Sequence, residues 1–378
     1  MLIRNILRNA GLVSGVYLYA SVRGRAVRAP RTLNRILVVQ TAKMGDMVCA
    51  TPVLHAIKEQ FPYIHITVLG DVVGKKVLAD SPDAHEYLVS SDGFFSLLHA
   101  MRRNRVDASI VLVPDARAIA LSYLAGIPLV VAPEVVNGYC PWMTKTYRAL
   151  LRLVKAVPHR MGHYAPGEYL QMLEPFGVRA DDTTKHLSYS DEARKNADAF
   201  LRAHGLTEKK FAVISPSAGN KIKNWPANRF ARVAEHLVAK GMPVVVIGSA
   251  RDREEVSAMI AAIEKPEGII DAFEQFPIDE LKAFIARAGL FVAVDTGPIY
   301  IAEAFGVSTV DIVGSMDERE QPPRSPQHLV VVPDREKPEL HIMNARVYDE
   351  QEARRQIEVI SVEMVISAID TLMPPFTV

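Results

Sequence analysis

Residues 35–62 read RILVVQTAKMGDMVCATPVLHAIKEQFP, and their pattern indicates how the chain folds. Its apolar run Ile36–Val39 predicts a buried strand, Gly45 allows a tight turn, and the apolar residues that follow recur at helical spacing. A strand that turns directly into a helix is the repeating unit of a parallel α/β sheet. Asp46 falls at the junction of strand and helix, where the loops of such a sheet bind ligands.

The same alternation continues along the chain and predicts two halves of similar build. In the first half we expect strands at Ile36–Val39, Ile64–Leu69, Ser109–Val113 and Leu129–Val131. In the second half we expect strands at Phe211–Ser215, Val244–Gly248, Leu290–Val294, Thr309–Val313 and Leu329–Val332. The pattern weakens over residues 155–190, which are rich in proline and glycine, and this places the domain junction near the end of that region.

The predicted architecture is therefore α/β, with two Rossmann-like domains facing a central cleft. We expect the first domain over residues 33–188 and the second over residues 189–350. Residues 1–32 read as a separate basic segment. Residues 351–378 contain a helix, for which packing back on the first domain is one option.

The composition indicates a soluble globular protein without a global electric field. Of the 378 residues, 49% are hydrophobic and 23% are charged, and the formal net charge is +1. Nucleic acid is therefore not an expected partner. The two cysteines, Cys49 and Cys140, form no C-x-x-C motif. This argues against a disulfide framework or a zinc site and favours a reducing compartment, the cytoplasm.

The N-terminal segment is basic, because residues 1–45 contain no Asp or Glu but carry Arg4, Arg8, Arg23, Arg25, Arg28, Arg31, Arg35 and Lys43. Apolar residues recur there at helical spacing: Leu2, Ile3, Ile6, Leu7, Ala10, Val13, Val16 and Tyr17. Two interpretations stay open, a helix on an anionic membrane, at the inner face of the inner membrane, or a helix packed on the protein body. A transit peptide is less favoured, because the fold starts directly afterwards.

Asp46 can play one of two roles at its strand-to-helix junction. Aspartate is a favoured helix cap, and capping alone explains such a position. A carboxylate there can also accept a proton from a hydroxyl group that is bound within hydrogen-bond reach. The residue is thus a candidate catalytic base.

A second candidate loop follows the expected strand Phe211–Ser215 and reads SPSAGNKIKNWP over residues 215–226. Its small residues allow close approach to a ligand, and a hydroxyl group, backbone amides and lysine charges can hold phosphate oxygens. The candidates for phosphate binding are Ser217, Gly219, Lys221 and Lys223. The alternative is a solvated loop that a buried Trp225 anchors.

Two further loops follow strands of the second half. Asp295, Thr296 and Gly297 follow one strand and precede a helix whose amino end favours a diphosphate, although Asp295 can also be only a cap. Asp252 follows another strand and can accept hydrogen bonds from ribose hydroxyl groups, whereas nearby Glu255 fits a solvated helix face. No G-x-G-x-x-G follows a strand, and the P-loop near-miss at residues 70–76 fits a plain loop.

Together and in this order, three segments resemble glycosyltransferase family 9, the family of the lipopolysaccharide heptosyltransferases. They are Arg35–Pro62, Val213–Ser249 with its KNWP and VVVIGS motifs, and Phe291–Gly314 with the sequence FVAVDTGPIYIAEAFGVSTVDIVG. The resemblance extends loosely over residues 33–335. It implies a GT-B fold, inversion at the anomeric carbon, and a reaction that requires neither a metal nor another cofactor.

The resemblance also assigns roles to residues. Asp46 matches the family's proposed base, and Lys223 matches the lysine that contacts the donor phosphates. The remaining matches form the phosphate loop and the donor-binding turn: Ser217, Gly219, Asp295, Thr296 and Gly297. Tyr300 departs from the pattern, since family members usually have histidine five residues after the aspartate of the third motif. Tyrosine still donates a hydrogen bond but carries no positive charge, which leaves the donor sugar open.

We therefore expect a glycosyltransferase that moves heptose from ADP-heptose to a hydroxyl group of a saccharide or lipid-linked saccharide of the bacterial envelope. Two alternatives stay open within the fold, a different nucleotide sugar as donor and an epimerase acting on sugar nucleotides. A third alternative is a non-catalytic scaffold that binds a sugar nucleotide.

Overall fold

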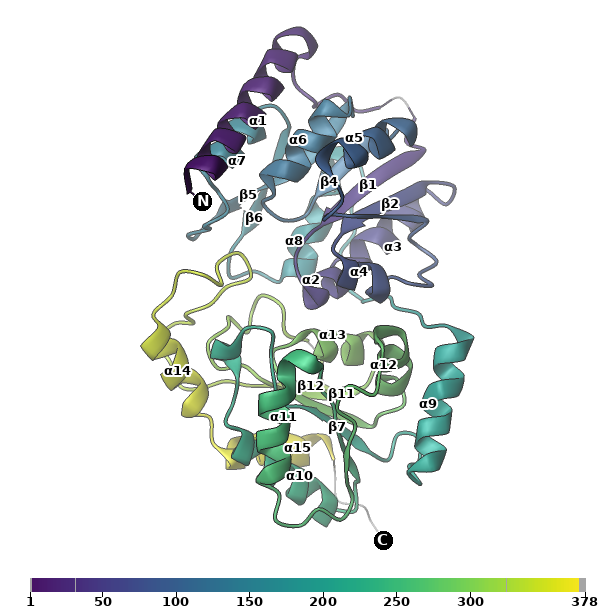
Figure 1. Cartoon of the computed structure of the whole chain (residues 1–378), viewed down its shortest axis with the longest axis vertical. Coiled ribbons are helices and arrows are strands. Elements are labelled where there is room, and N and C mark those ends of the chain that lie inside the picture. The colour runs from purple at the N-terminus through teal and green to yellow at the C-terminus, as the bar shows by residue number, and fades with distance from the viewer. Residues whose placement is uncertain (1, 31, 324, 374–378) are drawn as a thin grey trace. The chain divides into compact units, whose positions relative to one another are not determined.

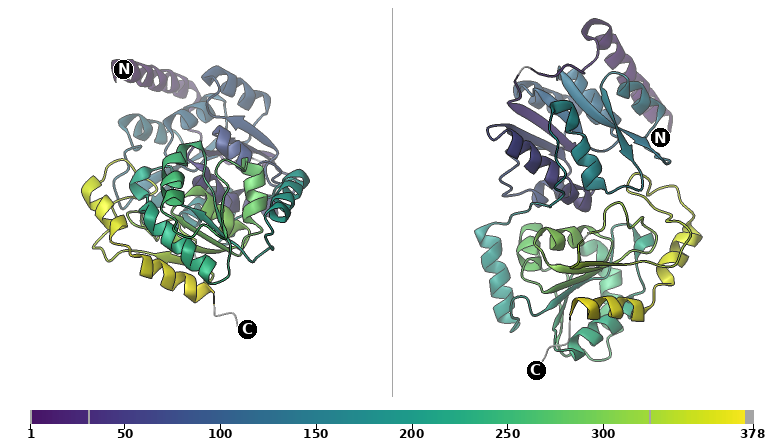
Figure 2. Two further views of the ribbon diagram at one scale, coloured as in Figure 1. Left: turned by 60° about the horizontal axis from the view of Figure 1, so that its bottom comes forward. Right: turned by 180° about the vertical axis from the view of Figure 1, so that it is seen from behind.

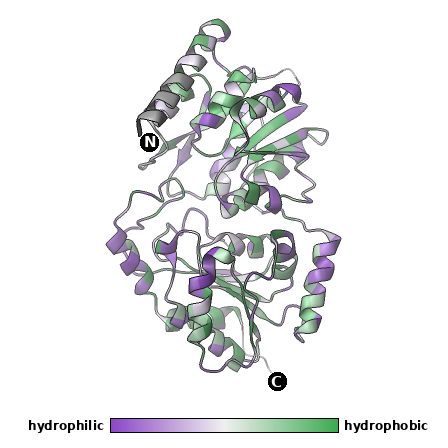
Figure 3. Cartoon of the chain, viewed as in Figure 1, coloured by the Kyte–Doolittle hydropathy of each residue, from purple (hydrophilic) through white to green (hydrophobic). Residues whose placement is uncertain are grey.

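The computed structural model describes residues 2–30, 32–323 and 325–373, with side chains from residue 13 onward. The chain divides into two compact units, residues 1–186 and 187–378 (Figure 1). Each unit has its own sheet, with apolar strands inside and the hydrophilic helices α9 (Asp191–Ala203) and α14 (Glu350–Glu358) on the surface of the second (Figure 3).

The first unit is built on a six-stranded sheet in the order β3-β2-β1-β4-β5-β6, in which every neighbouring pair is parallel. Its strands are β1 (Arg35–Gln40), β2 (His65–Gly70), β3 (Glu86–Val89), β4 (Ala108–Val111), β5 (Leu129–Val136) and β6 (Lys155–Arg160). Its helices are α1 (Leu2–Arg23), α2 (Met44–Cys49), α3 (Thr51–Gln60), α4 (Val72–Val77), α5 (Phe94–Arg103), α6 (Ala116–Leu124), α7 (Lys145–Leu151) and α8 (Ala165–Gln171), with the short helix η1 (Glu174–Phe176).

The second unit repeats this plan in the order β12-β11-β10-β7-β8-β9, again with parallel pairs. Its strands are β7 (Ala212–Ser215), β8 (Val244–Val246), β9 (Ile269–Asp271), β10 (Leu290–Val294), β11 (Ser308–Ile312) and β12 (His328–Val331). Besides α9 and α14, its helices are α10 (Ala227–Ala239), α11 (Arg253–Ala261), α12 (Ile278–Ile285), α13 (Gly297–Ala304) and α15 (Val362–Leu372), with η2 (Lys221–Lys223) and η3 (Ala250–Asp252).

Both sheets change their direction of growth beside the first strand. In the first unit the chain adds β2 and β3 on one side of β1 and then returns to place β4 on the other side. In the second unit β10 returns beside β7 in the same way. The two loops at such a switch point run in opposite directions and leave room for a ligand at the carboxyl ends of the strands.

The strands that the sequence predicts are confirmed within a few residues, whereas three others were missed. The missed strands are β3, β6 and β9, which lie at sheet edges and are only partly buried. The expectation of a plain loop over residues 70–76 was wrong, because α4 forms there and Asp71 caps it by accepting a hydrogen bond from the Gly74 amide at 2.6 Å.

The C-terminal helix packs within the second unit rather than back on the first domain. Val365 and Ile369 of α15 are fully buried and belong to the same core cluster as Val310 and Ile312 of β11. The sequence left open that this helix packs back on the first domain, and the structure corrects that option. The reason is the apolar stripe of α15, which covers the face of the second sheet that α10 also covers.

Helix α1 lies at the periphery of the first unit, against α6 and α7 (Figure 2). Val16 is fully buried, and the Tyr17 hydroxyl group donates to the Ala149 carbonyl oxygen at 2.7 Å. The chain after the helix is also fastened, since the Ala26 amide donates to the Leu153 carbonyl oxygen at 2.8 Å. The interpretation of a helix packed on the body therefore holds for residues 13–28.

The other side of α1 is exposed to solvent. Leu18 is 76% exposed and Val22 is 89% exposed, one helical turn apart. The side chains of residues 2–12, which include most of the expected apolar face, lie outside those described, as does Arg31. No helix within the described parts of the chain has the length and apolar character that crossing a bilayer requires.

Val16 and Val22 offer a matched test of this packing. We expect Val16→Ala to destabilise the first unit by about 1–3 kcal/mol, because two buried methyl groups are lost and a cavity remains. Val22→Ala makes the same change at an exposed position of the same helix and should leave the stability almost unchanged. Calorimetric melting of both variants checks this, and equal melting temperatures would show that α1 is not packed on the unit.

Candidate active site

Asp46 lies at the switch point of the first unit, in the first turn of α2 directly after β1. Lys43 caps this helix, and its amide donates to the Asp46 carboxylate at 3.0 Å. Asp46 is therefore the third helical residue rather than the cap itself, and its carboxylate bonds back to the start of the helix. The side chain is partly exposed, so a hydroxyl group can reach it.

A second carboxylate lies on the other side of the same switch point. Asp115 follows β4, caps α6 through the Ala118 amide at 3.0 Å, and accepts a hydrogen bond from the Thr41 hydroxyl group at 3.0 Å. This bond ties the loop after β1 to the loop after β4. Sequence reasoning missed Asp115, although its position after a β-branched run was a usable signal.

In the second unit, Lys223 and Asp295 meet at the corresponding switch point. The Lys223 ammonium lies 2.7 Å from the Asp295 carboxylate, and the two side chains are only 17% and 4% exposed. The Tyr300 hydroxyl group donates to the other carboxylate oxygen of Asp295. Asp295 thus anchors a lysine and a tyrosine instead of capping α13.

Helix α13 begins beside this ion pair. Its cap is Thr296, whose side chain makes no capping hydrogen bond, and Gly297 is its first residue. Both residues are partly exposed. Pro298 has no amide hydrogen, and the Ile299 amide donates to the Thr296 carbonyl oxygen at 3.1 Å. The Gly297 amide can therefore bind an anion at the positive end of the helix dipole.

A second polar cluster joins the loop after β7 to the loop after β8. The Lys221 ammonium lies 2.9 Å from the Ser217 hydroxyl group, 2.7 Å from Glu255 and 3.5 Å from Asp252. Gly219 lies exposed in the loop between the serine and the lysine. The structure therefore brings together the residues of this loop and Asp252.

Glu255 does not belong to a solvated helix face, as the sequence suggested. Its side chain is 19% exposed and accepts a hydrogen bond from Asn224 at 2.9 Å besides its ion pair with Lys221. Glu255 lies in the first turn of α11, and its side chain points into the loop that carries Lys221. The sequence pattern did not reveal this orientation. Glu255 is thus an additional acceptor at this site.

Asp252 is held as a carboxylate. Burial alone would raise its pKa, but hydrogen bonds from Ser249 and Ser217 and the charge of Lys221 lower the pKa below its usual value. The Ser249 hydroxyl group donates to Asp252 at 2.6 Å. An ionised carboxylate of this kind accepts hydrogen bonds from ligand hydroxyl groups.

Trp225 anchors the loop that carries the two lysines. Its ring is 2% exposed, and its Nε1 donates to the Ile360 carbonyl oxygen at 2.9 Å. Arg229 donates to the same oxygen at 2.6 Å. Trp225 is therefore the buried anchor that the alternative interpretation of this loop expected. The exposed part of the loop can still bind a ligand.

The family model of glycosyltransferase family 9 (heptosyltransferase) matches residues 95–346. The chain belongs to glycosyltransferase family 9. A lipopolysaccharide heptosyltransferase 3 of Escherichia coli is 27% identical over 301 residues, which are 72% of this chain and 80% of that protein. A lipopolysaccharide heptosyltransferase 2 of the same species is 21% identical over 313 residues, or 79% of this chain and 87% of the relative.

Solved structures of family 9 glycosyltransferases share the fold. The family 9 protein of Veillonella parvula has a TM-score of 0.73 at 24% identity and covers 91% of this chain and 99% of its own. An Escherichia coli heptosyltransferase solved with ADP-2-deoxy-2-fluoro heptose has a TM-score of 0.65 at 15% identity, with 89% and 99% covered. The chain is thus a glycosyltransferase of the GT-B fold.

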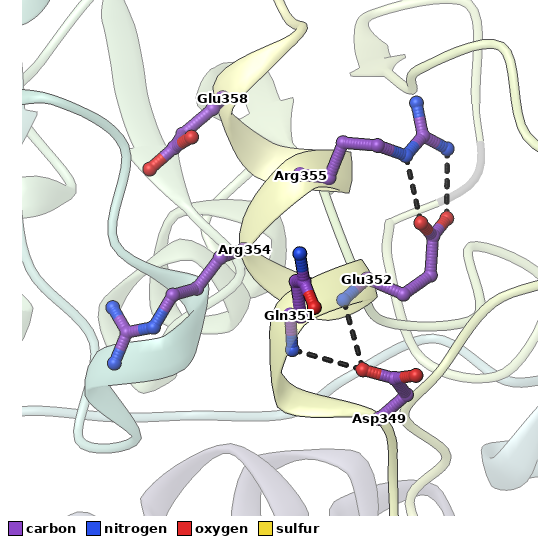
Figure 4. Close-up of a pocket in the computed structure, with 6 residues that line it drawn as sticks. All are labelled: Asp349, Gln351, Glu352, Arg354, Arg355 and Glu358. Carbon is purple, nitrogen blue, oxygen red and sulfur yellow. Dashed lines mark hydrogen bonds and ion pairs between the residues drawn. The ribbon is translucent and has the colours of Figure 1, made fainter.

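A charged hollow along α14 of this family 9 protein contains none of the predicted site residues. It is lined by Asp349, Gln351, Glu352, Arg354, Arg355 and Glu358 (Figure 4). Arg355 donates two hydrogen bonds of 2.7 Å to Glu352, and Asp349 caps the helix. The Arg355–Glu352 pair lies within one helix, and the hollow contains no predicted donor-binding residue, so we do not place the donor there.

A second cluster, Asp317, Glu320 and His341, brings three potential metal ligands within 4.8 Å of one another. His341 lies 3.0 Å from Glu320, and Arg319 bonds the Asp317 carboxylate at 2.8 and 2.6 Å. The hydrogen bond to Glu320 raises the pKa of His341 despite burial. Arg319 already donates to both carboxylate oxygens of Asp317, so we interpret the cluster as a charge network that fastens the chain after β11.

Proposed function

We propose that this glycosyltransferase transfers heptose from ADP-heptose to a hydroxyl group of a lipopolysaccharide-type saccharide, with inversion and without a metal. The observation that carries the proposal is the Lys223–Asp295 pair beside the amino end of α13, at a switch point of the second sheet. A cation and a helix amino end at one place are suited to a diphosphate. The heptosyltransferase relatives and the structure solved with an ADP-heptose analogue support the choice of donor.

In the proposed reaction, the second unit binds the donor. Lys223 has three N–H donors, of which Asp295 takes one, and the others can bind the phosphate oxygens. Ser217, Gly219 and Lys221 line the phosphate loop, while Asp252 accepts from the ribose. Negative charge builds up on the departing diphosphate, and the lysine and the positive end of the α13 dipole stabilise it electrostatically.

The first unit supplies the base. Asp46 takes the proton of the acceptor hydroxyl group while the oxygen attacks the anomeric carbon. The bond to the diphosphate breaks, and ADP leaves with the electron pair. Attack on the face opposite to the leaving group inverts the configuration of the anomeric carbon.

Tyr300 favours a second candidate donor within the same reaction. Its side chain is 2% exposed and donates to Asp295, so it adds no positive charge to the donor site. A sugar nucleotide other than ADP-heptose is therefore the alternative. A panel of nucleotide sugars in a thermal-shift assay decides between them, because a ligand that binds the native state raises the melting temperature. No response to any nucleotide sugar would contradict the proposed function.

We also propose that α1 contacts an anionic membrane surface. Leu18 and Val22 form an exposed apolar surface on α1, and two exposed arginines, Arg25 and Arg28, follow them in the sequence. Apolar side chains beside arginines bind the headgroup region of anionic lipids. Such contact would bring the enzyme to a lipid-linked acceptor on the inner face of the inner membrane.

Asp46→Asn should reduce transfer by about 10²–10⁴-fold and leave ADP affinity nearly unchanged, because only a general base is lost. Transfer from ADP-heptose to truncated lipopolysaccharides and calorimetric ADP binding measure the two effects. Asp71→Asn is the control, since the Asp71 carboxylate also accepts a backbone amide hydrogen bond at the start of a helix that follows a strand. The asparagine side-chain oxygen accepts such a bond as well, so a purely structural role of the Asp46 carboxylate would leave both variants active.

Lys223→Ala should weaken the binding of ADP far more than that of adenosine, because a lysine that contacts phosphates discriminates by charge. Titration calorimetry with the two ligands measures the difference. Lys240→Ala is the control, since Lys240 also pairs with an aspartate, Asp370, at 2.6 Å, but on the outside of the second unit. Equal losses for ADP and adenosine would rule out the phosphate contact.

The double variant Leu18→Ser, Val22→Ser should bind anionic liposomes several-fold more weakly than the unchanged protein. Binding of the unchanged protein should also fall with salt, since each basic residue contributes about 1 kcal/mol that salt screens. Co-sedimentation measures both effects. Val347→Ser, Val359→Ser changes two other exposed valines, which are 55% and 46% exposed, and should have no effect. Equal binding by both double variants would remove the membrane proposal.

A further inference from the structure

Asp311 is a fully buried acid between two apolar residues, Val310 and Ile312, of strand β11. Its exposure is 0%, and it lies on β11, the neighbour of β10 in the second sheet. Neither of its carboxyl oxygens has a hydrogen-bond partner among the described residues. A buried polar group without a partner is costly, so its presence calls for a role.

The strand's alternation shows which groups surround Asp311. Val310 and Ile312 belong to the core that α10 and α15 cover, so Asp311 faces the opposite side of the sheet, where α13 packs on β11. Its partner in the strand register is Ala293, two residues before Asp295. The charged groups that act on it are Asp295, Lys223 and Glu303.

The charges around Asp311 indicate its protonation state. Lys223 is the cation of this group and already lies 2.7 Å from Asp295. A second ionised carboxylate beside Asp295 would repel it in a medium that screens poorly. Burial first, and then the charges of Asp295 and Glu303, raise the pKa of Asp311 well above its usual range, and Lys223 offsets this only in part. Burial and the neighbouring carboxylates thus favour the uncharged form of Asp311.

We propose that Asp311 is a positioning residue of the donor site, an uncharged acid that leaves Lys223 a single close carboxylate to balance. This inference rests on the proposed role of Lys223 as the lysine that binds the donor diphosphate. With Asp311 neutral, the charge of the lysine stays available to the phosphates. An ionised Asp311 draws the ammonium toward the sheet and repels the diphosphate.

The consequence is a loss of donor affinity at alkaline pH. Asp311 keeps its proton below its raised pKa and releases it as the pH passes that value. Folding is linked to the same proton: because the pKa is raised in the folded state, the stability contribution is lost as pH rises. Donor KM should rise with pH, and kcat should fall as well, because the Lys223 ammonium that Asp311 draws away also stabilises the departing diphosphate.

The test compares the unchanged enzyme with Asp311→Asn, which is neutral at every pH and has the same shape. ADP binding is measured by calorimetry from pH 7.5, where the terminal phosphate is mostly ionised, to pH 9.5. We expect the Kd of the unchanged enzyme to rise about tenfold as Asp311 ionises, and that of the variant to change by less than about twofold over the same range. Asp191→Asn alters an aspartate whose side chain is 84% exposed in the same unit, and it should follow the unchanged enzyme.

Parallel pH profiles for Asp311→Asn and the unchanged enzyme would overturn the inference. If the variant does not fold, the unchanged enzyme alone provides the test, through the rise in its melting temperature that ADP causes. This rise should be smaller at pH 9.5 than at pH 7.5. An equal rise at both pH values would overturn the inference. Failure of the proposed function looks different. In that case the unchanged enzyme does not bind ADP, or Lys223→Ala binds ADP normally.

Discussion

The change in the direction of sheet growth beside β1 and beside β7 is the constraint on which both candidate sites depend. Parallel strands can be joined only by crossovers, and the helices of these crossovers occupy the faces of the sheet. Two neighbouring loops therefore separate only where the chain reverses its order, at β1 and β4 and at β7 and β10. Asp46 and Asp115 lie at the first of these places, and Lys223 and Asp295 lie at the second.

The Lys223–Asp295 ion pair then determines which ligands the site in the second unit can bind. A buried ion pair stabilises a protein only if its desolvation is offset by good geometry and further hydrogen bonds. Asp295 meets this condition through Lys223 and Tyr300 together. The pair thereby keeps a lysine inside a largely buried site, where its field is screened less than at the surface.

The sequence predicted the central strands well because they are buried on both faces and read as continuous β-branched runs. The edge strands β3, β6 and β9 lack such runs, since their side chains are partly exposed. Asp295, which directly follows a strand, and Asp46, which lies in the helix after a strand, were found because the strands beside them were recognised in the sequence. Glu255 and Asp311 were not, because their importance comes from neighbours that are distant along the chain.

The hydrogen bond from Trp225 to the Ile360 carbonyl oxygen has a consequence for how the protein is made. Trp225 lies two residues after Lys223, so the loop that carries this lysine is held by a segment near the C-terminal end of the second unit. During synthesis the first unit can fold while the second is still being made. The lysine loop, in contrast, gains this anchor only after the segment that contains Ile360 has been synthesised. A chain that stops before Ile360 therefore has a complete first sheet but lacks the hydrogen bond that holds the lysine loop.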